Sequence, residues 1–261
     1  MIQPESGIVI LGTGRMAVFL IRTFRDNQIP LLGIWGRNTD QSGKLASQYG
    51  IRHIQDMGAI PPETGFCFLA VSDDAIPEVS LAVPSVSGPL VHTSGAAPLD
   101  AIASPHRKAV LYPLQTLGGG PLLSASNIPF LLEASHPADL RVLHRLADRI
   151  AQTVVEMSSQ ERLKLHLAAV MVNNFTNHII ELAEDYCKEA QLPFSLLHPL
   201  IERTAQLAID FPGQSRQTGP AKRADQQTIR QHLALLHEHS ALRELYETLT
   251  QSLQKRYPPE K

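Results

Sequence analysis

The sequence feature that most constrains the fold is a glycine-rich turn close to the start of the chain. Residues 8–11 form a short, apolar, β-branched run, and Gly12-Thr13-Gly14 follows it directly. An apolar pattern at helical spacing then begins at once, with Met16 and Phe19 on one side. A strand, a glycine turn and a helix in this order are typical of a dinucleotide site, where phosphates bind the free N–H groups of the helix N-terminus.

The small residues of this turn have separate predicted roles. Gly12 permits the tight turn, Gly14 lets the backbone approach a pyrophosphate, and Ala17 keeps the helix close to the strand. We therefore predict that the first cofactor contacts are Gly12, Thr13, Gly14, Arg15 and Met16.

The composition fits a globular protein and argues against two other classes. The 261 residues are 43% hydrophobic and 18% charged, and the net charge is −2. Such a charge offers no electrostatic attraction to nucleic acid or to an anionic membrane. No signal peptide or membrane-spanning run is recognisable, and the two cysteines are expected to be buried free thiols. We therefore expect a cytoplasmic protein, and no His or Cys spacing predicts a metal site.

Strand and helix patterns alternate through the first part of the chain. Strands are expected at residues 8–11, 31–35, 51–54, 66–71, 90–92, 110–112, 128–133 and 154–156, with helices ending near 27 and at 43–49 and 140–152. This alternation predicts a doubly wound, mostly parallel α/β sheet of the Rossmann type.

Only helical patterns follow this part of the chain. They cover residues 160–190, 194–209, 225–237 and 240–255. A domain boundary is therefore expected near residue 157, between an NADP-binding Rossmann domain (1–157) and an all-α domain for dimerisation and substrate binding (158–261).

Ligands of an open α/β sheet lie outside the carboxyl ends of its strands. The strand at 66–71 ends in Val71 and leads into Ser72 and Asp73, and the following strand leads into Thr93 and Ser94. These ends carry small or hydrogen-bonding side chains and together outline a crevice. We predict that Val71, Ser72, Asp73 and Thr93 contact the cofactor.

The end of the second strand indicates which dinucleotide binds. NAD sites place Asp or Glu there for the ribose 2′-hydroxyl, whereas an arginine accommodates the 2′-phosphate of NADP. This chain has Arg37 and Asn38 at that point, and Asp40 comes later as an expected helix N-cap. We predict NADP as the cofactor, with Arg37 and Asn38 as contacts. A solvated surface arginine is the alternative interpretation.

The turn at residues 92–95 is open to two interpretations. Ser94 is a candidate catalytic residue, although it lacks the Gly-x-Ser-x-Gly frame of a hydrolase nucleophile. The simpler interpretation is a glycine-permitted turn with hydrogen bonds to the nicotinamide side. Asp73 and Asp74 could form a carboxylate pair, but an N-cap for a helix near residue 75 explains them better.

The long helix carries polar side chains on an otherwise apolar stretch. His166, Asn173 and Asn177 fall on one stripe with Val170, and Asn174 lies at its edge. Buried polar groups need partners. The partner is either a substrate or a neighbouring helix in a dimer, and the spacing does not choose between them.

Several motifs make the chain resemble a known family. They are the glycine turn, residues 71–76, 92–96 and 112–116, the helix with His166 and Asn174, and residues 218–225. The set is similar to a family of largely uncharacterised Rossmann-like proteins grouped as candidate NADP oxidoreductases, with a C-terminal helical domain of unknown function. More distantly it resembles the 6-phosphogluconate dehydrogenase superfamily, which includes pyrroline-5-carboxylate reductase and deazaflavin-dependent NADP reductases. The resemblance implies a Rossmann domain, a helical dimerisation domain and an active site between them.

The chain departs from that superfamily at one position. The resemblance to its β-hydroxyacid dehydrogenases implies a catalytic lysine shortly before an Asn-Asn pair, and here Val170 precedes Asn173 and Asn174. Alcohol oxidation of that type is therefore not favoured. His166, one turn earlier on the same face, could replace the lysine, or the chemistry could be imine reduction.

Two functions follow from these observations. The first is an NADP(H)-dependent oxidoreductase that moves a hydride to or from a small C=O or C=N substrate, with His166, Asn173, Asn174 and Ser94 as candidate catalytic residues. The alternative is a non-catalytic NADP(H)-binding dimer that senses or scaffolds. A homodimer is expected in both cases, because the long helix needs more apolar cover than the short helices after it supply.

Overall fold

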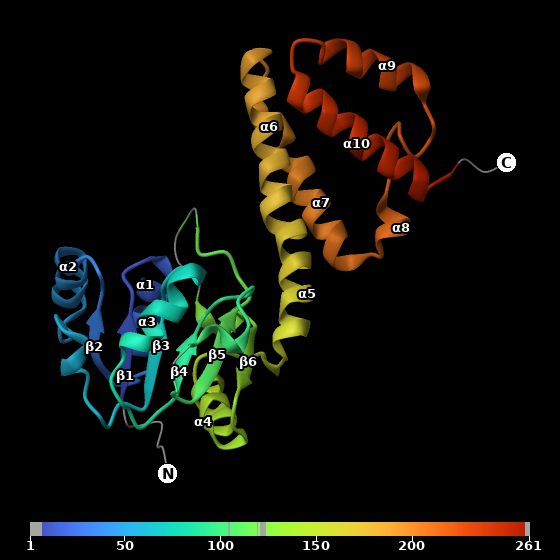
Figure 1. The fold of residues 1–261 in the computed structure, drawn as a ribbon. Helices are drawn as coiled ribbons and strands as arrows, with labels where there is room; N and C mark the ends of the chain where they lie inside the picture. The colour runs from blue at the N-terminus through green and yellow to red at the C-terminus, as the bar shows by residue number, and fades with distance from the viewer. Residues whose placement is uncertain (1–6, 104, 119, 121–123, 259–261) are drawn as a thin grey trace. The chain divides into compact units, whose positions relative to one another are not determined.

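The computed structural model describes residues 7–103, 105–118, 120 and 124–258. The chain divides into two compact units, residues 1–174 and residues 175–261. The first unit contains the sheet, and the described part of the second contains helices but no strand (Figure 1). The domain boundary expected near residue 157 stays a prediction.

A seven-stranded sheet forms the first unit, in the order β2-β1-β3-β4-β5-β6-β7. Neighbouring strands are parallel except for β5 and β6, which are antiparallel. The strands are β1 (Ile8–Leu11), β2 (Leu31–Trp35), β3 (Phe66–Leu69), β4 (Leu90–His92), β5 (Lys108–Pro113), β6 (Phe130–Ala134) and β7 (Val154–Glu156). The predicted fold class, a Rossmann-type and mostly parallel sheet followed by an all-helical part, is confirmed.

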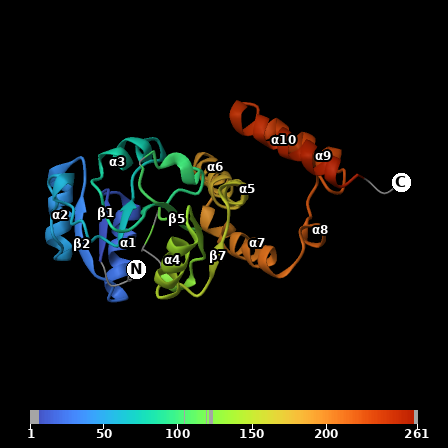
Figure 2. The same ribbon diagram turned by 60° about the horizontal axis from the view of Figure 1, so that its bottom comes forward.

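Helices cover both faces of this sheet, which gives the three layers seen in Figure 2. The helices α1 (Arg15–Asp26), α2 (Thr39–Tyr49) and α4 (Pro137–Asp148) pack on one face, and α3 (Ile76–Ala82) packs on the other. Every residue of β1 and β3 is buried, because both faces of these strands are covered. Along α1 the buried residues Ala17, Leu20 and Phe24 recur every three to four positions, which is the spacing of one helix face.

A capped helix follows the last strand. Its first part is α5 (Ser159–Val170), which is followed by a π-helical stretch, η6 (Met171–Phe175), and by α6 (Thr176–Glu189). The hydroxyl of Ser158 accepts the Glu161 N–H, and the Glu161 carboxylate accepts the Ser158 N–H. This capping box satisfies two backbone donors that a helix start leaves unpaired.

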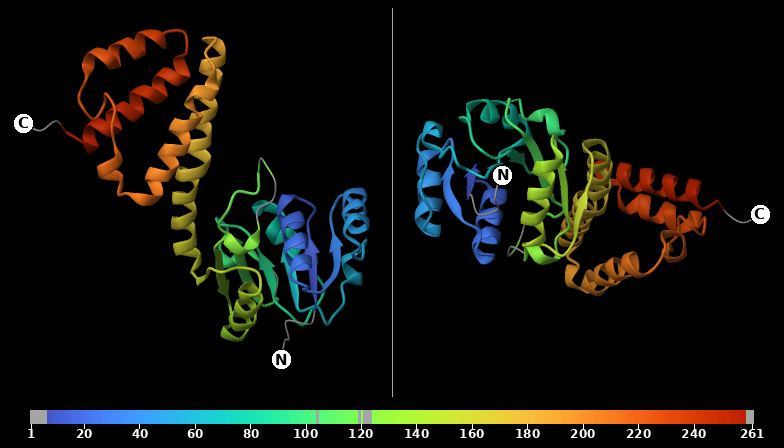
Figure 3. Two further views of the ribbon diagram at one scale, coloured as in Figure 1. Left: turned by 180° about the vertical axis from the view of Figure 1, so that it is seen from behind. Right: turned by 90° about the horizontal axis from the view of Figure 1, so that it is seen from below.

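The second unit has a very small core of its own. Besides α6 it contains α7 (His198–Asp210), α8 (Gly213–Arg216), α9 (Gln226–Leu235) and α10 (Ser240–Arg256), which the left view of Figure 3 shows. All three clusters of buried apolar residues belong to the first unit as far as the structure is described. In the described part of the second unit the buried apolar side chains are Cys187, Ala221, Ile229 and Leu236.

The structure also corrects some expected elements. The strand expected at residues 51–54 is wrong, because that segment makes a single bridge, between His53 and Ile34, before an Asp56-capped turn ends the pairing. The helix expected at 43–49 begins four residues earlier, at Thr39, because Asn38 caps it. None of the described helices is long and apolar enough to cross a membrane.

Candidate active site

The glycine turn after β1 has the geometry that only glycine allows. Gly12 has a φ of +132°, and a Cβ at this residue would lie 2.1 Å from the carbonyl oxygen of Ala70. Its N–H donates to the carbonyl of Trp35 at 2.8 Å, which ties the turn to β2. Gly14 is the N-cap of α1 and has open space where a Cβ would stand. Because no side chain caps α1 and its first turn has no acidic residue, its free N–H groups suit an anion.

The turn lies at the point where the sheet changes direction. The chain leaves β1 for β2 on one side and later returns to β3 on the other, so the carboxyl ends of β1 and β3 bound a crevice. A cavity of about 490 Å³ opens beside the turn between β1 and α1, and its other walls come from α2 and the loop after β5. Its lining includes three predicted cofactor contacts, and the full set is Thr13, Gly14, Arg15, Val18, Gln41, Leu45, Leu117 and Gly120. Met16, another predicted contact, is half-buried and packs against the core below.

Arg37 and Asn38 lie at the end of β2, as predicted. Arg37 is exposed and lines a cavity of about 410 Å³ together with Trp35 and Glu78. The side chain of Asn38 accepts the N–H of Gln41 at 3.0 Å and so caps α2. The expectation that Asp40 caps this helix is wrong, because Asp40 already lies in the first turn. Its carboxylate there still interacts favourably with the helix dipole.

The ends of β3 and β4 are joined by a hydrogen bond between two predicted residues. The Ser94 hydroxyl donates to the Asp73 carboxylate at 2.8 Å and accepts the N–H groups of Ala96 and Ala97 at 3.1 and 2.9 Å. Asp73 therefore binds Ser94, and the expectation that it caps the next helix is wrong, since that helix shows no side-chain cap. Ser94 closes a turn in this structure.

The remaining predicted contacts follow the same two strands. Val71 is half-buried and Ser72 is exposed at the end of β3, whereas Thr93 is buried after β4.

His92, the last residue of β4, is fully buried and holds the loop that follows. Its Nδ1 accepts the Ser94 N–H at 3.2 Å, and its Nε2 contacts the carbonyl of Pro98, also at 3.2 Å. Nε2 must therefore carry the proton. Burial, and after it the charge of Arg162, lowers the pKa of His92 to about 4. The imidazole is consequently neutral at pH 7, and both of its nitrogens make hydrogen bonds within the loop after β4.

A second cavity, of about 560 Å³, lies between the end of β5 and the helix α5–η6. Three predicted residues meet in it, His166, Asn173 and Asn174, and the lining is otherwise mainly apolar. The Tyr112 hydroxyl lies 3.1 Å from Nδ1 of His166, and the two rings meet edge to face. A mainly apolar cavity of this size with a few convergent polar groups is typical of a small-molecule site.

Asn173 and Asn174 lie in an irregular part of the helix. Both lie in the π-helical stretch η6, and the Asn173 amide nitrogen is 3.5 Å from the Asn174 side-chain oxygen. Single π-turns inside α-helices occur frequently at functional sites.

Gly95 leaves the space that the Tyr112–His166 pair occupies. A Cβ at Gly95 would stand 2.6 Å from Nδ1 of His166 and 2.7 Å from Cζ of Tyr112. The loop after β4, the end of β5 and α5 therefore pack directly against one another at this point.

Tyr112 and Gly95 were not predicted as site residues, although both lie in motifs that carry the resemblance. The contact between Tyr112 and His166 joins residues 54 positions apart, which no local spacing reveals. The available signal was a tyrosine ending an apolar strand beside other polar strand ends.

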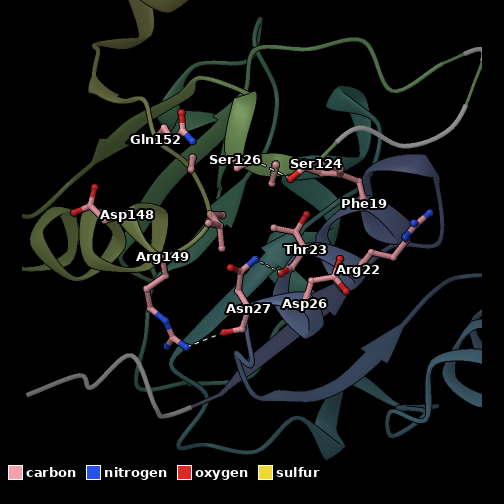
Figure 4. Close-up of a pocket in the computed structure, with 13 residues that line it drawn as sticks. Phe19, Arg22, Thr23, Asp26, Asn27, Ser124, Ser126, Asp148, Arg149 and Gln152 are labelled. Atoms are coloured by element: carbon pink, nitrogen blue, oxygen red, sulfur yellow. Dashed lines mark hydrogen bonds between the residues drawn. The ribbon is translucent and has the colours of Figure 1, made fainter.

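A further cavity, of about 440 Å³, lies between the C-terminal ends of α1 and α4. Figure 4 shows Arg149 of this cavity donating to the carbonyl of Asn27, at 2.9 Å. It contains none of the predicted site residues. Among the described residues no three His, Cys, Asp or Glu side chains gather as a metal ion would require.

The fold and the site define a class of protein: a Rossmann-type nucleotide-binding unit with a polar pair in a neighbouring cavity. Residues 128–253 match the family described as Domain of unknown function (DUF2520). No protein of curated function matches the sequence.

Several solved structures have a similar fold. A candidate NADP oxidoreductase from Bacteroides fragilis is 29% identical, with a TM-score of 0.88 over 97% of this chain and 99% of that one. A reductive aminase from Aspergillus terreus, solved with NADPH and ethyl levulinate, is 12% identical, with a TM-score of 0.71 over 94% of each chain. The 1-pyrroline-5-carboxylate reductase from Streptococcus pyogenes is 13% identical, with a TM-score of 0.61 over 95% of this chain and 98% of that one. The resemblance drawn from the sequence motifs is confirmed.

Proposed function

We propose that this chain is an NADP(H)-dependent oxidoreductase that transfers a hydride to or from a small C=O or C=N substrate. The observation that carries the proposal is the Tyr112–His166 pair, 3.1 Å apart in a cavity beside a dinucleotide-type crevice. The printed names of the relatives point in the same direction, since one is a candidate NADP oxidoreductase and another is a reductive aminase solved with NADPH.

The residues that follow β1 and β2 fit the cofactor. The pyrophosphate is held by the free N–H groups at the start of α1, where Gly14 leaves open space. Arg37, exposed after β2, binds the 2′-phosphate with the bidentate geometry that a guanidinium offers. When bound, NADPH supplies the hydride.

His166 supplies the proton that must accompany a hydride. The Tyr112 hydroxyl donates to Nδ1 of His166, which leaves the proton of the ring on Nε2. As the double bond is reduced, Nε2 donates its proton to the oxygen or nitrogen of the substrate while Nδ1 takes the proton of the Tyr112 hydroxyl, and solvent then returns a proton to the Tyr112 oxygen. Asn173 and Asn174 orient the substrate through their amides. This arrangement suits a chain in which Val170 occupies the place of the expected lysine.

The cofactor assignment is tested by fluorescence titration of NADPH and NADH. We expect the wild type to bind NADPH more tightly, and Arg37→Ala to lose about tenfold in NADPH affinity with little change for NADH, which is the effect of one charge-assisted contact. Arg52→Ala, an exposed arginine that lines none of the four cavities, is the control. Equal wild-type affinities would contradict the assignment.

The chemistry is tested by NADPH oxidation with ethyl levulinate plus methylamine, and with the cyclic imine 1-pyrroline. We expect His166→Ala to abolish turnover while NADPH affinity and assembly stay unchanged. A variant that instead dissociates or melts much earlier would make the histidine structural. Binding of NADPH without turnover of any carbonyl or imine would favour the alternative, a non-catalytic sensor or scaffold.

The protein works as a homodimer built from its helical part. Large apolar side chains of the second unit are exposed, among them Leu196, Leu200 and Ile209 at 74%, 63% and 80%. Patches of this kind mark interaction surfaces. A second copy of the chain provides matching apolar cover through an isologous interface. Two free, buried cysteines fit a reducing compartment, which supports a cytoplasmic location for this dimer.

A further inference from the structure

Arg162 is a buried cation close to the proposed catalytic pair. It lies on α5, four residues and therefore about one turn before His166, and it is 1% exposed. Its Nη1 donates to the Glu133 carboxylate at 2.5 Å, and its Nη2 donates to the carbonyl of Ala97 at 2.7 Å. One guanidinium therefore ties α5 both to β6 and to the loop after β4.

Ser159 completes this connection. Its hydroxyl donates to the Glu133 carboxylate at 2.7 Å and accepts the N–H of Leu99 at 2.9 Å. It also lies 3.3 Å from Nη2 of Arg162. The start of α5, strand β6 and the loop after β4 thus share one hydrogen-bonded network.

The loop in this network is the one that packs on the catalytic pair. It carries Gly95, whose missing side chain makes room for Tyr112 and His166. The neutral ring of His92 holds this loop through Ser94 and Pro98. Arg162 holds the same loop through the carbonyl of Ala97. A shift of this loop or of α5 would change the distance between Tyr112 and His166.

The charge of Arg162 reaches the same pair. Burial raises the pKa of Tyr112, and the positive charge of Arg162 opposes that rise.

A buried ion pair, such as that between Arg162 and Glu133, is seldom more stabilising than well-packed apolar side chains of similar volume. Stability alone therefore does not explain an arginine and a glutamate at this place. Their hydrogen bonds, which fix the positions of α5, β6 and the loop after β4, do explain them.

We propose that Arg162 is the positioning residue of this site, and that it holds His166 against the Tyr112 hydroxyl by fixing α5 and the loop after β4. The catalytic meaning of this contact rests on the proposed function, but the contact itself does not. Arg162 acts through other residues, because it does not line the cavity.

The test observes the imidazole of His166 directly. Two-dimensional long-range ¹H–¹⁵N NMR spectra of the full-length protein report the tautomer of each histidine ring, and the His166 signals are assigned by their loss in His166→Gln. In the wild type we expect a single tautomer with the proton on Nε2. In Arg162→Lys the two ring nitrogens of His166 should move toward the averaged shifts of a free imidazole, because an ammonium cannot reproduce the two-sided contact of the guanidinium.

Arg149→Lys is the matched control. Arg149 also donates to a backbone carbonyl of the first unit, but at the α1–α4 cavity (Figure 4). This variant should leave the His166 signals unchanged. If Arg162→Lys does not fold, Glu133→Gln takes its place in the test, because it keeps the arginine and weakens its counter-charge. We expect the same change of tautomer in Glu133→Gln. A folded variant at either position with wild-type His166 signals would overturn the proposal.

A kinetic measurement separates this proposal from the proposed function. With NADPH and 1-pyrroline, Arg162→Lys should lower kcat at least tenfold with the Kd for NADPH unchanged, whereas general loosening of the fold would weaken both. If the NMR result is as expected but His166→Ala retains full turnover, the positioning role stands and the catalytic assignment of His166 fails.

Discussion

Both ring nitrogens of His92 make hydrogen bonds within the loop that follows β4. Because protonation of the ring would break one of them, the free energy of unfolding depends on pH. The pKa of this histidine is about 4 in the folded chain, mainly because the ring is buried, against an ordinary value of 6.5. Below pH 6.5 the unfolded chain binds a proton that the folded chain refuses until about pH 4. The stabilisation that a neutral His92 gives is therefore complete above pH 6.5 and is lost progressively as the pH falls toward 4.

The pH dependence of the free energy of unfolding tests this role of His92. Between pH 7 and pH 5 His92 should remove about 2 kcal/mol from the free energy of unfolding, as measured with urea. His92→Gln should be less stable than the wild type at pH 7 but should lose this part of the slope. His237→Gln, at an exposed ring, is the control. A wild-type slope in His92→Gln would contradict the prediction.

Gly95 and Gly14 differ in the space that surrounds them. An alanine Cβ at Gly95 would collide with Tyr112 and His166, so Gly95→Ala should lower stability by about 1–3 kcal/mol. At Gly14 a Cβ meets nothing within 4 Å, so Gly14→Ala should leave stability unchanged but weaken NADPH binding. Urea unfolding and fluorescence titration together check both expectations. An equal effect of the two substitutions on stability would contradict this assignment.

At the scale of elements, α5 is defined at both ends by unusual local structure. The capping box of Ser158 and Glu161 determines where it begins, and the hydrogen bonds from Ser158 hold the pKa of the Glu161 carboxyl below its usual value. The π-helical stretch η6 follows its last residue and carries Asn173 and Asn174. The position of His166 along the helix axis therefore depends on where the helix starts.

The cap is tested by a substitution in the same turn. Ser158→Ala should cost about 1 kcal/mol of unfolding free energy, because the Glu161 N–H loses its acceptor. Gln160→Ala, an exposed position two residues on, should change it by a few tenths at most. If the two variants melt at the same temperature in calorimetry, the capping box does not stabilise α5.

At the scale of the whole molecule, the two units differ in how much of their apolar surface is covered. The sheet unit encloses its core clusters, whereas no described residue of α7 or α10 is buried. If a second copy of the chain supplies the missing cover, a charge on this surface should separate the copies.

Light scattering measures this separation. The wild type should be a dimer at micromolar concentration, and Leu200→Glu should be largely monomeric, because the interface would bury an unpaired charge. Leu81→Glu is the matched control, since Leu81 is also 63% exposed but belongs to α3 of the sheet unit. A monomeric wild type, or an equal effect of both substitutions, would contradict the homodimer.

The sequence predicted most of the sheet because apolar runs between glycines and prolines determine it locally. The bounds of β1, β2, β4 and β7 were predicted to the residue. The segment 51–54 failed although it is apolar, because strand formation depends on a partner and only the bridge to Ile34 forms. The four-residue helix α8 was not predicted, because Gly213 lies within it.

The site could be predicted only where its residues lie in one local pattern. The glycine turn and the stripe of His166 and Asn173 follow helical or turn spacing. Tyr112, Gly95 and the bond between Arg162 and Glu133 join separate segments, and their spacing in the sequence carries no periodicity. Arg162 lies in the polar first turn of its helix, between Glu161 and Lys164, so the local pattern carried no signal that its side chain is buried.

The two cysteines give each unit its own chemical reporter. Cys67 lies in the fully buried strand β3, where burial raises the pKa of its thiol to about 12, and Cys187 is buried in α6 of the second unit. An alkylating reagent must reach the sulfur atom, so neither of these buried cysteines is available in the native state. Pulsed alkylation followed by mass spectrometry would therefore time the opening of the sheet at Cys67 and of the helical unit at Cys187, in one sample and without an added label.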